Sequence, residues 1–513
     1  MKQSLYQYIK ENIDKDEVFT SPTLPDQPHP TVPRALGSDD AFFYTTEAPA
    51  DQEGAKTLAS LLRTYLRQPT PERKQALYKG VKVRCMTALC DPFLDIFQRE
   101  EFHGHLLDLA RSLFYNAMDR EVLKFAYLLF ALYGMERIRK SELELWRDLV
   151  TVAHCEEFTF FFLYACRSSA CDPQKEIWEL LGCTNGWGKV YALNDVQPTE
   201  EWQQEWLIKY GMDLEVEYFP LAASLLTKTH LLNYLETAEP DYDGYKGAGV
   251  ILNNYLLLLN NFPLELLEES FHISTIPLYP LITAYLKQAQ DFAKIPEELL
   301  DVLSISTGLT NLLKEERYYG LTANEINQLI ASCDQLIYQE DWRDYLERHL
   351  IKRGVVNYPL LDFALELEVD LWPRLHKFWR THPLEIGLFP YLLSYLDETD
   401  RSRRMIAEIT ERIHLYADNQ DALVMPMRYL KEHPGEGEGI LIFALTGMYD
   451  WPRGIACAII DEWGLEYLTP ALREALWKAR KLSGHKVIDA RIDALLAGRQ
   501  FNLREMMKKD TKG

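Results

Sequence analysis

Four cysteines follow one histidine in the first half of the chain, and these two residue types bind metal ions in many proteins. Cys155 comes directly after His154, and Cys166, Cys171 and Cys183 follow further along. Structural zinc sites usually pair their ligands two to four residues apart. Four residues separate Cys166 from Cys171, whereas Cys155 and Cys183 stand alone. The spacing therefore predicts buried thiols at these positions and no metal site.

Two glycine-rich segments are candidates for binding a phosphate group. A dinucleotide-binding turn follows a strand, opens a helix and has a characteristic glycine spacing. Neither segment follows a predicted strand, and neither has that spacing. We predict loop glycines in both segments, at Gly244, Gly247 and Gly249 and at Gly435, Gly437 and Gly439.

The common catalytic motifs are missing from the chain. It has no Gly-x-Ser-x-Gly elbow, no His-Glu-x-x-His pair and no Walker A loop. Gly454 and Cys457 imitate part of a haem-thiolate loop, but the rest of that loop is lacking. The sequence therefore predicts no catalytic residue, no cofactor and no metal ligand, and it favours a protein that is not an enzyme.

The most distinctive segment of the chain places a large aromatic residue between two glycines. Gly186 and Gly188 bracket Trp187, and Trp206 lies downstream. A rigid ring at a tight turn either fills a gap between helices or faces a ligand. His230, which precedes two leucines, is a further candidate. Packing is the favoured interpretation for these five residues, which are also the candidate contacts to a ligand or partner.

The charge of the chain limits its partners. Lys and Arg number 55 against 77 Asp and Glu, a formal net charge of -22 in 513 residues. Proteins that bind nucleic acid neutralise phosphates with Lys and Arg, so this balance argues against nucleic acid and against anionic membranes. A local basic patch remains at Arg401, Arg403 and Arg404.

The short apolar segments, residues 1–10 and the cysteines together predict a cytoplasmic protein. The longest, Val250–Leu259 and Phe158–Cys166, are far shorter than the ~20 residues that a membrane span needs. No secretory signal is recognisable in residues 1–10. Most of the eight cysteines lie within apolar helical runs, which indicates buried thiols and a reducing compartment.

Helical periodicity dominates from Gly54 onward and predicts an all-α fold without a sheet. Asp119 is placed to cap a helix that Gly134 ends, and Ser141 stands three residues before Glu144, as in a capping box. In the first helix after Gly54, apolar residues recur at helical spacing, at Leu58, Leu61, Leu62, Tyr65 and Leu66. Later helices are predicted at 202–210, 250–260, 278–293, 321–336, 358–367, 371–380, 401–416, 441–448, 455–463, 471–480 and 487–496.

Two segments resemble the second helix of a HEAT repeat. Residues 119–126 and 450–458 both place an aspartate ahead of an apolar, a basic and a small residue, among them Ala126 and Ala456. Short helices joined by brief turns are typical of such repeats. We predict a HEAT/armadillo-like α-solenoid of stacked helix hairpins; a globular helical bundle is the alternative.

The predicted organisation has four parts. Residues 1–54 form an arm with a helix at Leu5–Ile13 and a proline-rich stretch at 21–33. Residues 55–240 and 241–500 hold the N-terminal and C-terminal repeats, and 501–513 form a polar tail. Turn-rich residues near Glu236–Gly249 and Ala293–Leu321 are the possible boundaries.

The chain also resembles a family of bacterial helical-repeat proteins whose members sometimes carry the label limonene hydroxylase. Residues 186–192, the helix with Glu205, Trp206 and Leu207, and the small residues Ala222 and Ala223 carry the resemblance. Residues 211–214 depart from the pattern of that family. The label implies oxygen insertion, which requires haem, iron, copper or flavin.

The sequence predicts an intracellular helical-repeat protein that binds a protein or peptide and is not an enzyme. The repeat pattern, the missing motifs and the 29 Tyr and 11 Trp support this function, because these rings serve well at interfaces. The alternative is an enzyme or binder that acts on a small molecule or modified nucleobase in a concave groove, including a hydroxylase.

Overall fold

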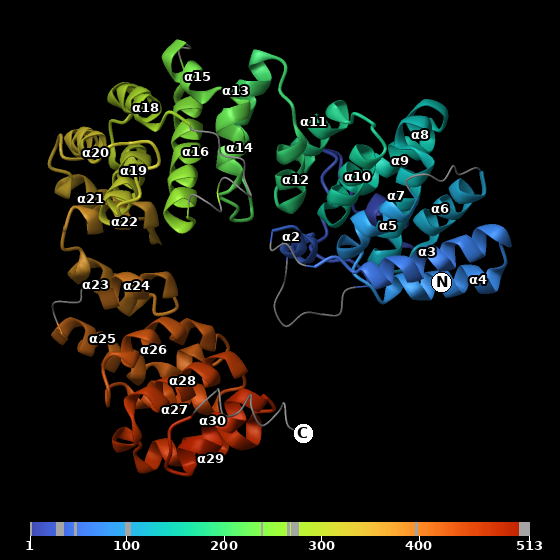
Figure 1. The fold of residues 1–513 in the computed structure, drawn as a ribbon. Helices are drawn as coiled ribbons and strands as arrows, with labels where there is room; N and C mark the ends of the chain where they lie inside the picture. Colours follow the sequence, from blue (N-terminus) through green and yellow to red (C-terminus); the bar gives the residue numbers. More distant parts are fainter. Residues whose placement is uncertain are drawn as a thin grey trace. The chain divides into compact units, whose positions relative to one another are not determined.

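The computed structural model describes residues 3–26, 35–45, 49–97, 104–237, 240–263, 267, 276–394 and 399–501, and its fold is all-α, as predicted. The chain divides into two compact units, Met1–Glu340 and Asp341–Gly513 (Figure 1). Among the described residues, no helix combines the length and the apolar content that crossing a bilayer requires.

Helices make up the first unit, and most of them pack on helices that are near in the chain order. Helix α6 packs on α7, α7 on α10 and α10 on α12, while α13, α16, α19 and α20 pack in succession. The elements are α1 (Leu5–Glu11), α2 (Ser38–Thr45), α3 (Gln52–Arg67), α4 (Pro71–Lys82), η1 (Thr87–Leu89), α5 (Cys90–Phe97), α6 (Gly104–Asn116), α7 (Arg120–Tyr133), α8 (Met135–Ser141), α9 (Leu143–Ala153), α10 (Glu156–Ser168), α11 (Gln174–Cys183), α12 (Trp187–Asp195), α13 (Glu201–Tyr210), α14 (Leu221–Lys228), α15 (Leu231–Thr237), α16 (Tyr242–Asn261), α18 (Leu278–Phe292), α19 (Pro296–Lys314) and α20 (Ala323–Ile337).

The second unit adds a small hairpin to its helices. Strands β1 and β2 pair Ile351 with Val356 around a turn at Arg353 and Gly354, both of which have positive φ. The prediction of no sheet is therefore wrong for these few residues. The elements are α21 (Arg343–His349), β1 (Ile351–Lys352), β2 (Val355–Val356), α22 (Tyr358–Glu366), α23 (Trp372–Thr381), η2 (Ile386–Leu388), α24 (Phe389–Ser394), α25 (Thr399–Glu411), η3 (Ile413–Tyr416), η4 (Gln420–Leu423), α26 (Val424–Lys431), α27 (Glu438–Thr446), α28 (Asp450–Trp463), η5 (Leu465–Tyr467), α29 (Pro470–Leu482) and α30 (Lys486–Leu496).

The predicted helix signals have mixed outcomes. Gly134 ends α7 with a φ of 106°, as predicted. Asp119 precedes α7 but its carboxylate does not cap it; it accepts from Tyr78 and pairs with Lys82 at 2.6 Å. The capping box at Ser141 is wrong, because Ser141 is the last residue of α8 and its hydroxyl donates to a carbonyl one turn earlier.

The glycines at 244, 247 and 249 are helical, so the prediction of a glycine loop there is wrong. They lie in α16, and a side chain at Gly247 would collide with the carbonyl of Ile208 in α13. The glycines let the two helices approach closely, at a cost in helix propensity that packing offsets. In the second run, Gly435 and Gly437 are loop residues with φ of 86° and 60°, while Gly439 lies within α27.

The predicted boundary near Ala293–Leu321 holds a helix. Pro296 opens α19 at its first position and Glu298 accepts from the backbone of Ile295, so the segment continues the helical packing. The predicted division between residues 240 and 241 lies inside the first unit, between α15 and α16.

The N-terminal segment packs on the helical body. Helix α1 contacts α6 and α9, and the backbone N–H of Leu5 donates to the carbonyl of Ala117 at 2.9 Å. Residues 27–33 of the proline-rich stretch and residues 502–513 of the tail lie outside the described residues.

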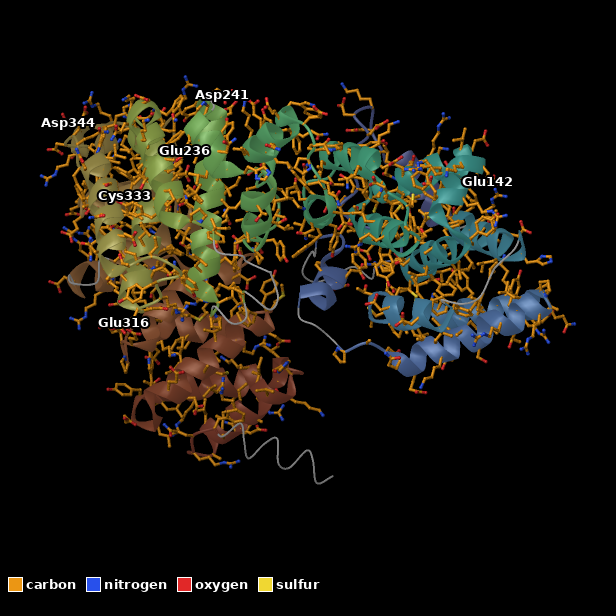
Figure 2. The ribbon with its side chains drawn as sticks, turned by 45° about the horizontal axis from the view of Figure 1, so that its top comes forward. Glu142, Glu236, Asp241, Glu316, Cys333 and Asp344 are labelled. Atoms are coloured by element: carbon orange, nitrogen blue, oxygen red, sulfur yellow. The ribbon has the colours of Figure 1, made fainter. Side chains whose placement is uncertain are left out.

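All eight cysteines are free, and seven of them are buried, as predicted; Cys85 is half-buried. Cys333 on α20 (Figure 2) is an example, and burial raises the pKa of its thiol to about 12. These thiols serve as small apolar packing groups.

The half-buried carboxylate of Asp301 on α19 faces α16. Asp301 Oδ1 accepts a hydrogen bond from Asn253 at 2.7 Å, and burial raises its pKa from the ordinary 3.8 to about 6, although Lys246 opposes the shift. Between these two pH values the folded chain binds this proton more tightly than the unfolded chain does. The contribution of the Asp301 carboxyl to stability is therefore present below pH 3.8, and it is lost as the pH rises through 6.

We expect Asp301→Asn to raise the free energy of unfolding by about 1–3 kcal/mol at pH 7, because the amide needs no buried charge. The gain should vanish near pH 3.5, where the native carboxyl is also neutral. Chemical denaturation at several pH values measures this. Asp291→Asn, at an exposed position of α18, is the control; an equal gain at both pH values contradicts the prediction.

Candidate functional site

The predicted Gly-Trp-Gly segment wraps the carboxylate of Glu156. Glu156 Oε1 accepts from the backbone N–H of Asn185 at 2.9 Å and of Gly186 at 2.7 Å, and Gly188 donates to Oε2 at 3.4 Å. A carboxylate at the first turn of α12 satisfies N–H groups that lack helical partners and complements the helix dipole. The segment therefore joins α10 to α12.

Both glycines are required by close contacts. A Cβ on Gly188 would lie 2.8 Å from Thr159 Oγ1 and 3.0 Å from Glu156 Cγ, and one on Gly186 would collide with the Glu156 carboxylate. The Trp187 ring is half-buried and packs on Tyr218 at 5.5 Å. The two glycines and Trp187 thus form a packing unit.

Trp206 belongs to a different group of rings, which we call the tryptophan surface: Trp178, Trp202, Trp206 and Tyr210 on α11 and α13. The ring of Trp178 lies 5.5 Å from Trp202 and 5.7 Å from Trp206, and Trp206 lies 5.6 Å from Tyr210. Trp202 is 58% exposed and Tyr210 is 42% exposed. The sequence pointed to Trp202 and Trp206 downstream of the Gly-Trp-Gly segment, but it did not predict that Trp178 on α11 contacts both of them.

The buried Lys189 packs against Trp206 of the tryptophan surface. Lys189 Nζ donates to the carbonyl of Asp213 at 2.8 Å and lies 5.8 Å from the ring centroid of Trp206. Burial lowers the pKa of Lys189, although Asp213 and Glu156 oppose the shift. This cation–π contact holds Trp206 in place.

His230 lies elsewhere, in the turn between α14 and α15. It is exposed, has a φ of 49°, and borders a cavity of about 410 Å³ together with Leu226 and Pro277. The candidate residues therefore occupy three places in the fold: the turn at the start of α12, the tryptophan surface, and this turn.

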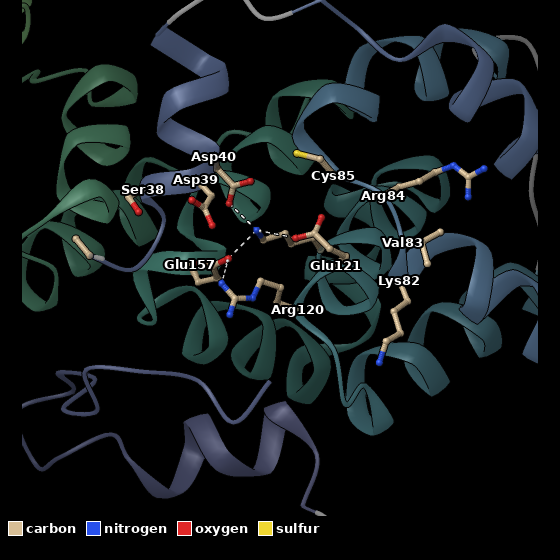
Figure 3. A pocket seen from close by; sticks show the side chains of 12 residues that line it. Ser38, Asp39, Asp40, Lys82, Val83, Arg84, Cys85, Arg120, Glu121 and Glu157 are labelled. Carbon is tan, nitrogen blue, oxygen red and sulfur yellow. Dashed lines mark hydrogen bonds and ion pairs between the residues drawn. The ribbon is translucent and has the colours of Figure 1, made fainter. Parts of the chain in front are cut away.

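A buried lysine that the sequence analysis missed organises a charged cleft (Figure 3). Lys124 Nζ lies 2.7 Å from Asp40 Oδ2, 2.7 Å from Glu157 Oε1 and 3.2 Å from Glu121 Oε1, and its side chain is 1% exposed. The three carboxylates come from α2, α10 and α7. A detectable signal was the lone lysine in an otherwise apolar helical run, Val122–Ala131.

Each carboxylate of this cluster has further partners. Glu157 accepts from the Gly37 backbone at 2.9 Å and from Arg120 Nη1 at 3.3 Å. Glu121 accepts from the Met86 backbone at 2.7 Å, and Asp40 accepts from the Thr87 hydroxyl. The cluster therefore joins α2, η1, α7 and α10.

The charges of the cluster decide its protonation. Burial opposes the charge of Lys124, but Glu157, Asp40 and Glu121 outweigh it and hold its pKa well above the ordinary value. Burial raises the pKa of Asp40 despite Lys124, whereas Lys124 and Arg120 overcome burial and lower that of Glu157. The two buried carboxylates are therefore shifted in opposite directions, and Asp40 takes up a proton at higher pH than Glu157 does.

The cleft has a volume of about 940 Å³ and offers little reactivity. Lys124 stays protonated, so its amine is no nucleophile. The Cys85 thiol borders the cleft, and burial raises its pKa, which keeps it in the unreactive thiol form. The polar atoms of the cluster are largely engaged with one another.

The comparisons with known proteins give no relative: no family model matches the chain, and no curated protein or solved structure has a significant match to it. The resemblances inferred from the sequence stay predictions.

We expect Lys124→Met to lower the free energy of unfolding by about 3–5 kcal/mol, because it removes the cation that pairs with buried Asp40 and one of the two cations that pair with buried Glu157. Urea denaturation followed by circular dichroism measures the loss. Lys82→Met, which removes an exposed lysine from its pair with Asp119, is the control and should cost about 1 kcal/mol or less. Equal losses in the two variants contradict the anchoring role of Lys124.

We expect Gly188→Ala to cost about 1–3 kcal/mol, because the added methyl group overlaps Thr159 and Glu156. Gly182→Ala is the matched control on α11, since a Cβ there meets nothing within 4 Å. The control should be neutral or stabilising, as alanine favours a helix. Thermal unfolding of both variants tests the prediction, which fails if they behave alike.

Proposed function

We propose that this chain is a non-enzymatic protein-binding protein and that the tryptophan surface binds a basic segment of a partner protein. The observation that carries the proposal is the exposure of Trp202, 58%, within a group of four contacting rings. Water contact with a large apolar ring is unfavourable, and burying that ring against a partner removes the cost.

The residue types of this surface favour protein recognition. Tryptophan and tyrosine are enriched among residues that contribute most to binding between proteins. The half-buried Trp178 contacts the ring of Trp202, so the exposed ring is held in place and loses little entropy on binding.

The charges around the surface favour a basic partner. Glu200 is the N-cap residue of α13, and the helix begins with Glu201 and carries Glu205. One local cation is already paired, because Lys209 Nζ lies 2.6 Å from Glu205 Oε1 and 2.7 Å from Asp241 Oδ2; Figure 2 labels Asp241. Exposed ring faces attract Arg and Lys side chains, and the net charge of -22 adds long-range attraction.

The proposal includes the repeat type, the compartment and the origin of the protein. The succession of packed helices in the first unit supports a HEAT/armadillo-like arrangement of repeats. Seven buried free thiols fit a reducing, cytoplasmic compartment. A bacterial origin follows only from the family resemblance.

The alternative, an enzyme or binder acting on a small molecule or a nucleobase in a groove, has weaker support. The charged groups around Lys124 are engaged with one another. The basic patch is also neutralised: Arg401 pairs with Asp370 at 2.9 Å, and Arg403 and Arg404 pair with Glu436 and Glu408. No specific observation favours this alternative or the hydroxylase label.

A photo-crosslinking amino acid at Tyr210 of the full chain should capture the partner, and one at the exposed Tyr449 of the second unit should not. The captured protein, once purified, is then titrated calorimetrically against variants. We expect Trp202→Ala to weaken binding roughly thirtyfold, about 2 kcal/mol. Added salt should also weaken it, since the partner segment is basic.

The matched control is Trp477→Ala, which removes a tryptophan that is 60% exposed on α29. This variant should bind as the wild type does. Equal losses in both variants, unchanged binding by Trp202→Ala, or crosslinks at both positions to the same proteins contradict the proposal.

A further inference from the structure

One histidine and two glutamates meet where the N-terminal segment crosses the helical body. Glu17, His154 and Glu179 each offer one ligand atom, and these atoms lie within 4.8 Å of one another. His154 follows the last residue of α9, Glu179 lies on α11, and Glu17 lies in the turn that joins Ile13 to Phe19. Residues more than 130 positions apart thus converge here.

The hydrogen bond of His154 determines which ring nitrogen is free. Nδ1 lies 2.8 Å from the backbone carbonyl of Glu17, and because a carbonyl only accepts, Nδ1 carries a proton. In the neutral ring, Nε2 is then unprotonated and can bind a metal ion. Metal-binding histidines are commonly oriented by such a bond from the other nitrogen to a carbonyl.

The free nitrogen is buried and points into the cluster. His154 is 4% exposed, and within the described part of the chain its Nε2 has no hydrogen-bond partner. Its near neighbour is Glu179 Oε1 at 3.4 Å. A buried polar atom without a partner is costly, so a ligand at this position would stabilise the fold.

We propose that His154, Glu17 and Glu179 bind one Zn²⁺ ion, which fastens the N-terminal segment to α9 and α11. One imidazole nitrogen and two carboxylate oxygens are ligand types that zinc takes. Two ligand atoms each about 2.1 Å from a tetrahedral ion are about 3.4 Å apart, which is the separation of Nε2 and Oε1.

The two glutamates can complete the site with small movements. Glu17 and Glu179 are exposed, so their carboxylates are free to rotate toward the ion, whereas His154 is held in place. The unusual φ of 63° at Glu17 is consistent with a turn shaped by its contacts. Two carboxylates also neutralise the charge of the ion.

Zinc binding to the purified, metal-free full chain tests this inference by calorimetric titration with zinc chloride. We expect one ion per chain, and Glu179→Gln should weaken binding at least roughly tenfold, as should Glu17→Gln. Both side chains are exposed, so these variants should fold. Glu144→Gln, at an exposed position of α9, is the control and should bind as the wild type does.

Two further measurements separate this site from adventitious binding. Zinc should raise the melting temperature and slow tryptic cleavage after the exposed Lys15, and Glu179→Gln should lose both effects. Cobalt in place of zinc should give a spectrum without a thiolate charge-transfer band. No stoichiometric binding, unchanged binding by both glutamate variants, or a thiolate band that depends on Cys183 overturns the inference.

Discussion

The first unit depends on one buried cation. The ammonium of Lys124 neutralises carboxylates from α2, α7 and α10, and those carboxylates also bind the backbone at Gly37 and Met86. Charges this deeply buried persist only when they are paired and hydrogen-bonded. The need to pair these buried charges therefore determines where α2 and the residues before α5 pack against the helical body.

A second carboxylate determines the approach of α10 and α12. Glu156, adjacent to Glu157, binds the first N–H groups of α12, and glycine is needed at 186 and 188 because any Cβ would displace that carboxylate or Thr159. With α10 and α12 held together, Lys189 lies beneath Trp206. The exposed rings of the tryptophan surface therefore rest on a well-packed base, which suits a binding surface.

Some helix positions could be predicted closely from the sequence, whereas the helix predicted at 401–416 ends at Glu411 and the one predicted at 455–463 begins at Asp450. The predicted helices at 278–293, 358–367 and 487–496 differ from α18, α22 and α30 by about a residue at each end. Local periodicity suffices for this, because a helix buries one face whatever its neighbours are. It failed where glycines or a boundary seemed to interrupt the pattern, at α16 and α19, since packing there outweighs local propensity.

By itself, the sequence determined the all-α fold, the buried thiols and the location of an unusual tryptophan segment, because each follows from residue type and short-range spacing. Only the tertiary structure decided which side chains meet. Two of the three carboxylates around Lys124 lie 84 and 33 positions away, and the two residues that approach the His154 ring lie 137 and 25 positions away. Spacing along one chain carries no information about such contacts, since they arise when separate helices pack and bring distant charges into one volume with little water.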